Sequence, residues 1–454
     1  MEMSRAVKKI NLRKFILVMA ACLLCYSAVK IIVDERFFWL AIPALPLVAY
    51  LSIREPFIFP FGMYLFLIPF DSVLSVTGRA QGTTLTKLLG ILTMMILLIK
   101  GSFENRFVQP DKTVLCWTFL GLYAASNYAW AIEPQLVLYR IPMALGLLTF
   151  YLIVSFYRAS EKQWNTLKIV LLLGGFLASI FSIYSYFSGS FYMESQRATL
   201  MFGGRQTNPD DIGFSLLIPV SICLEILFAD GKFDWKKIAC ILVLATMLFC
   251  AIVTGSRGAM LGIGVIFLVF LLSSGRKFAM GLFFIAISLP LVSLMLQFLT
   301  ARWGDAYSSG GAGRLEIWSV GLRAIRAYWL TGAGTDNFPI AYTQFVNYGT
   351  GFEGFFRASH NIYLQFIVEQ GLIGTAFLFW GLIRHYMLIR SKRDAGESDK
   401  KMLTGAFWAM LAAAFFGDFF WDKSFWVLWM MIIIFDNLHK TARGFKTVMR
   451  DGEI

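Results

Sequence analysis

Three arginines stand in sequence contexts that suit the binding of a phosphate group. Arg257 lies in Thr-Gly-Ser-Arg-Gly at residues 254–258, where glycine favours a tight turn that presents backbone N–H groups beside the guanidinium. Arg197 and Arg205 lie upstream in a polar segment. A guanidinium group donates two parallel hydrogen bonds to phosphate oxygens. We therefore expect these three arginines, together with Ser256, to bind a diphosphate.

His360 is a candidate general base. It stands at the start of an apolar stretch and is followed by Asn361. Histidine is the usual general base near neutral pH and could take a proton from an attacking hydroxyl while the arginines stabilise a departing diphosphate. Helical spacing places Asn361, Gln365 and Glu369 along one stripe of the following helix. A glutamate inside an apolar stretch indicates a polar cavity or a buried partner, and packing inside the bundle is the alternative.

A second group of charges stands between the last two apolar stretches. Asp418, Asp422 and Lys423 lie within six positions of one another. We expect a local ion pair that fixes this turn. The alternative is that Lys423 joins the diphosphate site.

The composition indicates that the helices which position these residues belong to a membrane protein. Hydrophobic residues make up 58% of the 454 residues, charged residues 15%, and the mean hydropathy is +0.66. A soluble domain is about 25% charged. The net charge of +13 would suggest a nucleic-acid partner in a soluble protein, but here it fits basic loops at a membrane. We expect an all-α, polytopic transmembrane bundle in contact with membrane lipid, and no nucleic acid.

Hydropathy predicts about 12 to 14 spans, from residues 15–33 to residues 424–439. The stretch at 57–70 is short and carries two prolines, so it is either a half-helix or part of a neighbouring span. Lys and Arg concentrate in alternate connections, which predicts that these connections and both termini are cytoplasmic. The basic connections include residues 1–14, 100–112, 158–168, 232–237, 384–401 and 440–450.

This topology places the candidate site on the outer face. Positive charge outside the membrane runs against the usual distribution, so Arg197, Arg205 and Arg257 need a reason to be there. The alternative to phosphate binding is an arginine that reaches lipid headgroups, which suits Arg197 better than Arg257.

The chain divides into three expected units. Residues 1–299 form the N-terminal transmembrane helices, 300–360 an external loop domain, and 361–454 the C-terminal transmembrane helices and cytoplasmic tail. The loop domain contains a predicted amphipathic helix, Arg314–Tyr328. Loops of this length usually carry function or are disordered, and its Trp and Phe content argues against disorder.

Several classes of function lack their sequence signals. The sequence holds no P-loop, no dinucleotide fingerprint and no His-Glu-x-x-His. The six cysteines lie in apolar runs and are expected to be small core residues rather than disulfides or zinc ligands. We expect no cofactor and no metal. A flippase or secondary transporter is the alternative to an enzyme, but no internal repeat is visible and the unusual charges gather at one face.

Four segments in order resemble one family. They are Val-Thr-Gly-Ser-Arg-Gly-Ala at 253–259, Gly-Arg-Leu-Glu-Ile-Trp at 313–318, Thr-Gly-Ala-Gly-Thr-Asp-Asn-Phe at 331–338, and Ser-His-Asn-Ile-Tyr-Leu at 359–364 followed by Glu-Gln-Gly-Leu-Ile-Gly at 369–374. In a multi-span chain they resemble the O-antigen ligase and polymerase superfamily of bacterial membrane glycosyltransferases. Residues 197–210 resemble the family's Arg…Asn-Pro pattern, with Leu200 where glycine is common.

The resemblance implies a GT-C-like fold in the bacterial inner membrane. It implies metal-independent, inverting transfer of a glycan from undecaprenyl diphosphate to an acceptor hydroxyl at the periplasmic face. Arg257 would then bind the diphosphate and His360 would act as the catalytic base. Further substrate-binding residues implied by the matching segments are Ser256, Arg314, Asn361, Glu369, Arg197 and Arg205.

The acceptor separates the members of this family. Ligases use lipid A-core, and polymerases use a second lipid-linked glycan. Related members serve exopolysaccharide assembly or glycosylate proteins. We expect a ligase. A polymerase is the alternative, because ligases and polymerases share these motifs.

Overall fold

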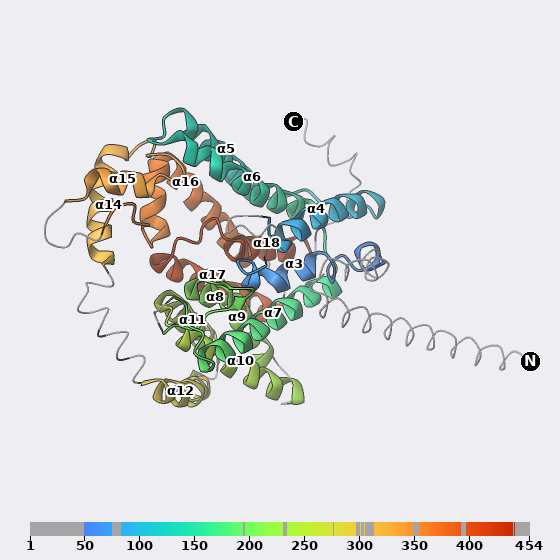
Figure 1. The fold of residues 1–454 in the computed structure, drawn as a ribbon. Coiled ribbons are helices and arrows are strands. Elements are labelled where there is room, and N and C mark those ends of the chain that lie inside the picture. The colour runs from blue at the N-terminus through green and yellow to red at the C-terminus, as the bar shows by residue number, and fades with distance from the viewer. Residues whose placement is uncertain are drawn as a thin grey trace, which may run out of the picture.

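The computed structural model describes residues 50–74, 83–193, 196–229, 234–275, 277–296, 313–347, 354–391 and 396–438, with 300, 304 and 440 as single residues (Figure 1). These ranges are mostly helical with almost no sheet, which confirms the predicted all-α class. The helices are α3 (Phe61–Leu67), α4 (Leu85–Phe103), α5 (Thr113–Ser126), α6 (Pro134–Phe156), α7 (Glu161–Phe187), α8 (Pro209–Ser215), α9 (Leu217–Phe228), α10 (Trp235–Val253), α11 (Arg257–Leu272), α12 (Lys277–Leu294), α14 (Arg314–Tyr328), α15 (Phe338–Phe345), α16 (Ile362–Ser391), α17 (Glu397–Ala413) and α18 (Lys423–Asn437). Short 3₁₀ turns are η2 (Ile68–Phe70), η3 (Asn127–Ala129) and η4 (Ala414–Phe416), and the strands β1 (Met201–Phe202) and β2 (Arg205–Gln206) form one hairpin.

Several helices are long and apolar enough to cross a membrane. Within the described ranges there are six, formed by α4, α6, α7, the pair α8–α9, α10 and α16. Shorter apolar helices include α11 and the α3–η2 segment, where the prolines cut the span short as the half-helix alternative predicts. The predicted span at 15–33 lies outside the described residues, as does nearly all of the one at 37–53.

The centre of the bundle is α18. Residues 425–437 of this helix are all buried, and it contacts α6, α16 and α17 (Figure 1). A helix that is apolar on every side lies either in a protein core or in a membrane, and here other helices surround it. Trp117 of α5 packs against Trp426 and Trp429 with ring centroids 5.3 and 6.3 Å away, and these rings fill the space between the helices.

Side-chain caps fix where several helices begin. Ser160 and Gln163 form a capping box at the start of α7, and Asp234 accepts a hydrogen bond from the backbone N–H of Lys237 at the start of α10. Such caps satisfy N–H groups that a helix cannot satisfy itself.

The external segment has its own small core. Helix α14 begins and ends where the amphipathic pattern predicts, and its apolar face packs on α15 and α16. Ile317 and Val320 of α14 are buried against Phe338 of α15 and Val368 of α16.

Helix α16 is broken at Gly371, which has a φ of +61°. The break leaves the carbonyls of Val368 and Glu369 without partners in their own helix. They accept hydrogen bonds from the backbone N–H groups of Ala333 (2.8 Å) and Gly334 (2.9 Å) in the loop that follows α14. In an apolar surrounding every backbone polar group needs a hydrogen-bond partner. The broken helix supplies the acceptors and the loop after α14 supplies the donors.

The substitution Gly371→Ala should therefore weaken the fold. A Cβ at this position would lie 2.3 Å from the carbonyl oxygen of Leu330, and the backbone conformation is one that side chains rarely adopt. We expect a loss of about 2 kcal/mol or more, seen as a lower melting temperature of the detergent-solubilised protein. The matched control is Gly264→Ala in α11, where a Cβ meets nothing within 4 Å. Equal melting temperatures for the two variants would contradict this account.

Candidate functional site

Arg197 joins the polar segment before α8 to the turn before α11. Its Nε atom donates to the carbonyl of Thr254 (2.7 Å) and its Nη2 atom to Asp210 (2.9 Å). The backbone N–H of Ala198 adds a hydrogen bond to Val253 (2.9 Å). The Arg197 side chain is only 13% exposed, so this guanidinium mainly holds two loops together.

The turn itself presents Arg257 at the start of a helix. Gly255 has a φ of +60°, and the buried hydroxyl of Ser256 accepts from the backbone N–H of Ala259 (3.4 Å) as the N-cap of α11. Arg257 is thus the first residue of α11, at the positive end of the helix dipole. Anions bind favourably at such an end.

Arg314 comes to the same place from the external segment. It is the first residue of α14, after Gly313 with a φ of +74°, and its guanidinium lies over the ring of Phe416 at 5.7 Å. Its Nη1 atom is buried and has no hydrogen-bond partner among the described residues. Burial, followed by the nearby charge of Arg257, lowers the pKa of Arg314. Two guanidinium groups in one partly buried place suit an anion that accepts from both.

Arg205 belongs to the hairpin before α8. It is in strand β2, after a turn in which Gly203 and Gly204 both have positive φ. Its Nη1 atom is also buried without a hydrogen-bond partner among the described residues. The charges that act on Arg314 include those of Arg257 and Arg197.

His360 is paired with Asp418. The His360 Nδ1 atom lies 3.2 Å from Oδ2 of Asp418, and the other carboxylate oxygen accepts from the Ser359 hydroxyl (2.7 Å) and the backbone N–H of Asn361 (3.1 Å). The His360 side chain is 45% exposed. A carboxylate that holds one ring nitrogen as a donor leaves the other as an acceptor.

The structure corrects the predicted ion pair in the turn before α18. Asp418 faces His360, and Lys423 reaches out of the turn to Asp71 (2.5 Å) and to the hydroxyl of Thr86 (2.7 Å). Asp71 and Thr86 are more than 300 residues before Lys423 in the sequence. The expectation that Lys423 pairs within its own turn was therefore wrong. Sequence reasoning missed the role of Asp418 because only folding brings it to His360.

Asn361 and Glu369 have structural contacts. The Asn361 side chain accepts from the backbone N–H of Leu364 (3.1 Å) and so caps α16. Glu369 is 2% exposed and accepts from the backbone N–H groups of Asp336 (3.0 Å) and Phe338 (3.1 Å). It lies nine positions after His360, about 13 Å along the helix. The buried-partner alternative therefore describes Glu369 best.

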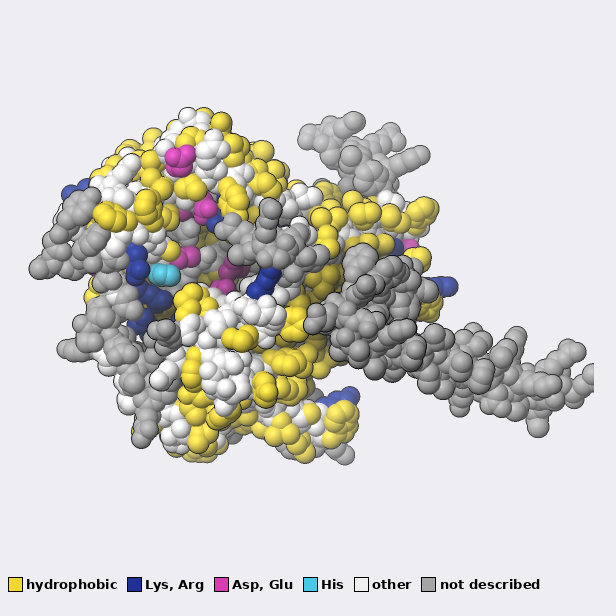
Figure 2. Space-filling view, viewed as in Figure 1, with side chains coloured by type: hydrophobic (Ala, Val, Ile, Leu, Met, Phe, Trp, Pro, Cys, Tyr) yellow, Lys and Arg dark blue, Asp and Glu magenta, His cyan; other side chains and the backbone are white. Residues whose placement is uncertain are grey.

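Figure 2 shows one face of the molecule with a histidine beside Lys and Arg side chains, at a hollow where Asp and Glu side chains are visible. Asp418 lies between the histidine and the arginines, because it contacts His360 and its charge also acts on Arg314. The structure thus brings together Arg257, Arg314 and His360.

The fold and the site define a helical membrane protein with a basic, histidine-containing centre at one end of its bundle. Residues 242–379 match the family model described as O-antigen ligase. Over this segment the match confirms the resemblance found in the motifs, to the O-antigen ligase and polymerase superfamily, a glycosyltransferase-like family. The matched segment contains Arg257, Arg314 and His360. No curated protein matches the chain.

The carboxylates near the site predict a pH-dependent stability. Burial, followed by the Asp71 carboxylate, raises the pKa of Asp422 in the turn before α18 to about 6. An acid whose pKa is raised by folding stabilises the fold when protonated, and this contribution is lost as pH rises through the folded-state value. Because the carboxyl has its ordinary pKa of 3.8 when unfolded and about 6 when folded, we expect the melting temperature to fall between about pH 4 and 6, and Asp422→Asn to reduce that fall. The control is Glu397→Gln in α17, and an unchanged profile for Asp422→Asn would refute the assignment.

Proposed function

We propose that this protein is a ligase-type glycosyltransferase that moves a glycan from undecaprenyl diphosphate to an acceptor hydroxyl. The observation that supports the proposal most directly is the His360–Asp418 pair beside the guanidinium groups of Arg257 and Arg314. A base and a diphosphate-binding pair at one place are what inverting transfer from a lipid diphosphate requires.

The two arginines and the start of α11 bind the diphosphate leaving group. As the bond between the anomeric carbon and the diphosphate oxygen breaks, its electron pair goes to the diphosphate. Arg257 and Arg314 stabilise the charge that develops there, and the buried Nη1 atom of Arg314 supplies one donor. Arg197 is a positioning residue, since its bonds to Thr254 and Asp210 hold the turn that presents Arg257.

His360 deprotonates the acceptor hydroxyl, which is the nucleophile. The Asp418 carboxylate accepts from Nδ1, so Nε2 is free of a proton and takes the one released by the acceptor hydroxyl. The hydroxyl oxygen bonds to the anomeric carbon on the face opposite the diphosphate, which inverts the configuration. Asp418 stabilises the imidazolium that results and does not touch the sugar.

We place the site at the periplasmic face of the inner membrane, with both termini in the cytoplasm. Lys236 and Lys237 stand at the start of α10, and the turn before Arg257 lies at its other end. Basic residues favour the cytoplasmic side, which supports this orientation. The site then lies where the expected units 1–299, 300–360 and 361–454 meet.

The substitution Asp418→Asn should abolish most transfer while leaving donor binding intact. One amide oxygen can still accept from Ser359 and Asn361, but the NH₂ group would face Nδ1 and force the proton onto Nε2 of His360. We expect transfer to slow about 100- to 10,000-fold, with the donor KM nearly unchanged. The control is Glu316→Gln in α14, a partly exposed carboxylate whose nearest cation is Arg323 at 3.6 Å. An Asp418→Asn variant that loses donor binding instead would show a structural role only.

The acceptor decides between ligase and polymerase, which share this geometry. Purified protein is incubated with undecaprenyl-diphosphate glycan alone and then with lipid A-core added, and the products are sized on a gel. We expect no change until lipid A-core is present and glycosylated lipid A afterwards. Chain growth from the donor alone would show a polymerase. No product in either case would favour another acceptor or a transporter.

A further inference from the structure

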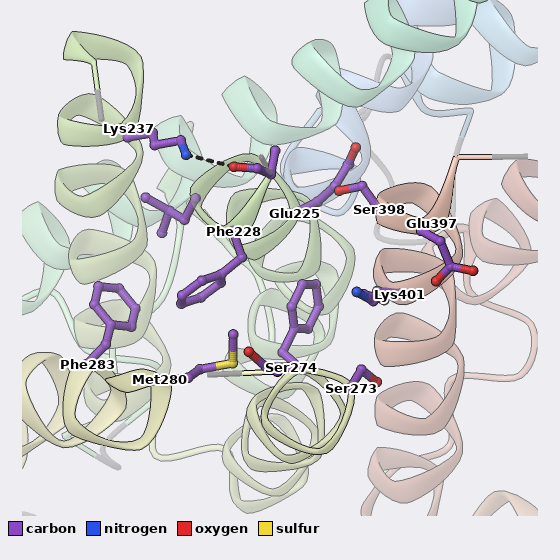
Figure 3. Close-up of a pocket in the computed structure, with 14 residues that line it drawn as sticks. Glu225, Phe228, Lys237, Ser273, Ser274, Met280, Phe283, Glu397, Ser398 and Lys401 are labelled. Atoms are coloured by element: carbon purple, nitrogen blue, oxygen red, sulfur yellow. Dashed lines mark hydrogen bonds between the residues drawn. The ribbon is translucent and has the colours of Figure 1, made fainter. Parts of the chain in front are cut away.

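A cavity lies at the other end of the helices that present the site. It has a volume of about 580 Å³ and is formed by the ends of α9, α10, α11, α12 and α17 (Figure 3). Helix α11 runs from Arg257 at the site to Leu272 at the cavity, about 24 Å away along its axis. The cavity is therefore separate from the site described above.

The cavity presents two cations. Lys237 of α10 lines one wall, where its Nζ atom donates to the carbonyl of Ala229 (2.7 Å). Lys401 of α17 lines the opposite wall, and Figure 3 shows its amino group extending toward the space. Within the described ranges, no carboxylate forms an ion pair with Lys401. Glu397, one turn earlier on α17, also lines the cavity. The part of the cavity at the Lys401 ammonium suits a phosphate group.

The cavity also presents a buried acceptor. Glu225 of α9 lines it and is 7% exposed. Its Oε1 atom accepts from Lys168 (2.6 Å), but Oε2 is buried and has no hydrogen-bond partner among the residues that the structure describes. Buried carboxylate oxygens are nearly always hydrogen-bonded, so a ligand that supplies a donor fits here.

The remaining walls are apolar. Phe228, Phe270, Met280 and Phe283 line the cavity between helices that are apolar enough to lie in a membrane. A ligand with a charged head and apolar chains matches this combination, because basic pockets between membrane helices bind lipid headgroups.

We propose that this cavity binds the headgroup of a membrane phospholipid. Lys401 contacts the phosphodiester, and the ammonium of an ethanolamine group or a hydroxyl of a glycerol group donates to Oε2 of Glu225. The acyl chains lie along the aromatic wall.

The test measures lipid retention on the delipidated full-length protein by native mass spectrometry. Phosphatidylethanolamine, phosphatidylglycerol and phosphatidylcholine are added separately. Phosphatidylcholine carries the phosphate but has no hydrogen-bond donor in its headgroup. We expect one tightly held molecule of either of the first two lipids and about tenfold weaker binding of phosphatidylcholine.

Variants locate the site. Lys401→Met should weaken binding of the two favoured lipids about tenfold. The control Lys400→Met removes the same charge from the next position of α17, which does not line the cavity, and should bind as the unchanged protein does. Equal retention by the two variants, or equal binding of all three lipids, would overturn the proposal. Binding of free phosphoethanolamine as tight as that of the intact lipid would also overturn it, because the apolar wall would then play no part.

Discussion

Hydrogen bonds between the broken helix α16 and the loop after α14 hold the external segment to the membrane helices. The carbonyls freed at Gly371 cannot remain unpaired in an apolar bundle, and the N–H groups of Ala333 and Gly334 satisfy them. The position of α14 follows from this contact. Because Arg314 is the first residue of α14 and His360 lies just before α16, the same break sets the distance between the Arg314 guanidinium and the His360 side chain.

Other contacts extend this arrangement to the rest of the face. The indole of Trp318 in α14 donates to the carbonyl of Ser359 (3.0 Å), directly before His360. On the other side, Arg197 fixes the turn before α11 to Asp210 at the start of α8. Segments far apart in the sequence thus meet through side chains that are themselves held by backbone groups, as a site that must be geometrically precise requires.

Local patterns in the sequence predicted the elements well. Hydropathy located most spans between α4 and α18, and the amphipathic spacing located α14, because both signals depend only on neighbouring residues. The motif resemblance pointed to Arg257, Arg314 and His360, which the structure brings to one face. The identity of their partners depends on contacts across the fold. Nothing near Asp418 in the sequence indicates His360, and nothing near Lys423 indicates Asp71.

Glu369 is a second case in which the sequence indicates the kind of surrounding but not the groups that form it. Its position in an apolar stretch indicated a polar surrounding, and that was correct, but the surrounding consists of the N–H groups at the start of α15. A buried carboxylate that satisfies backbone donors has the same sequence signal as one that binds a ligand. Only the contacts distinguish the two.

Separating donor binding from transfer tests the central claim, that arginines hold the diphosphate while His360 activates the acceptor. The measurement is retention of radiolabelled undecaprenyl-diphosphate glycan by purified Arg257→Ala and His360→Ala variants, with transfer assayed on the same preparations. We predict that Arg257→Ala loses donor retention and transfer together, while His360→Ala retains the donor and loses transfer. Full transfer by either variant, or loss of donor retention in His360→Ala alone, would contradict the account.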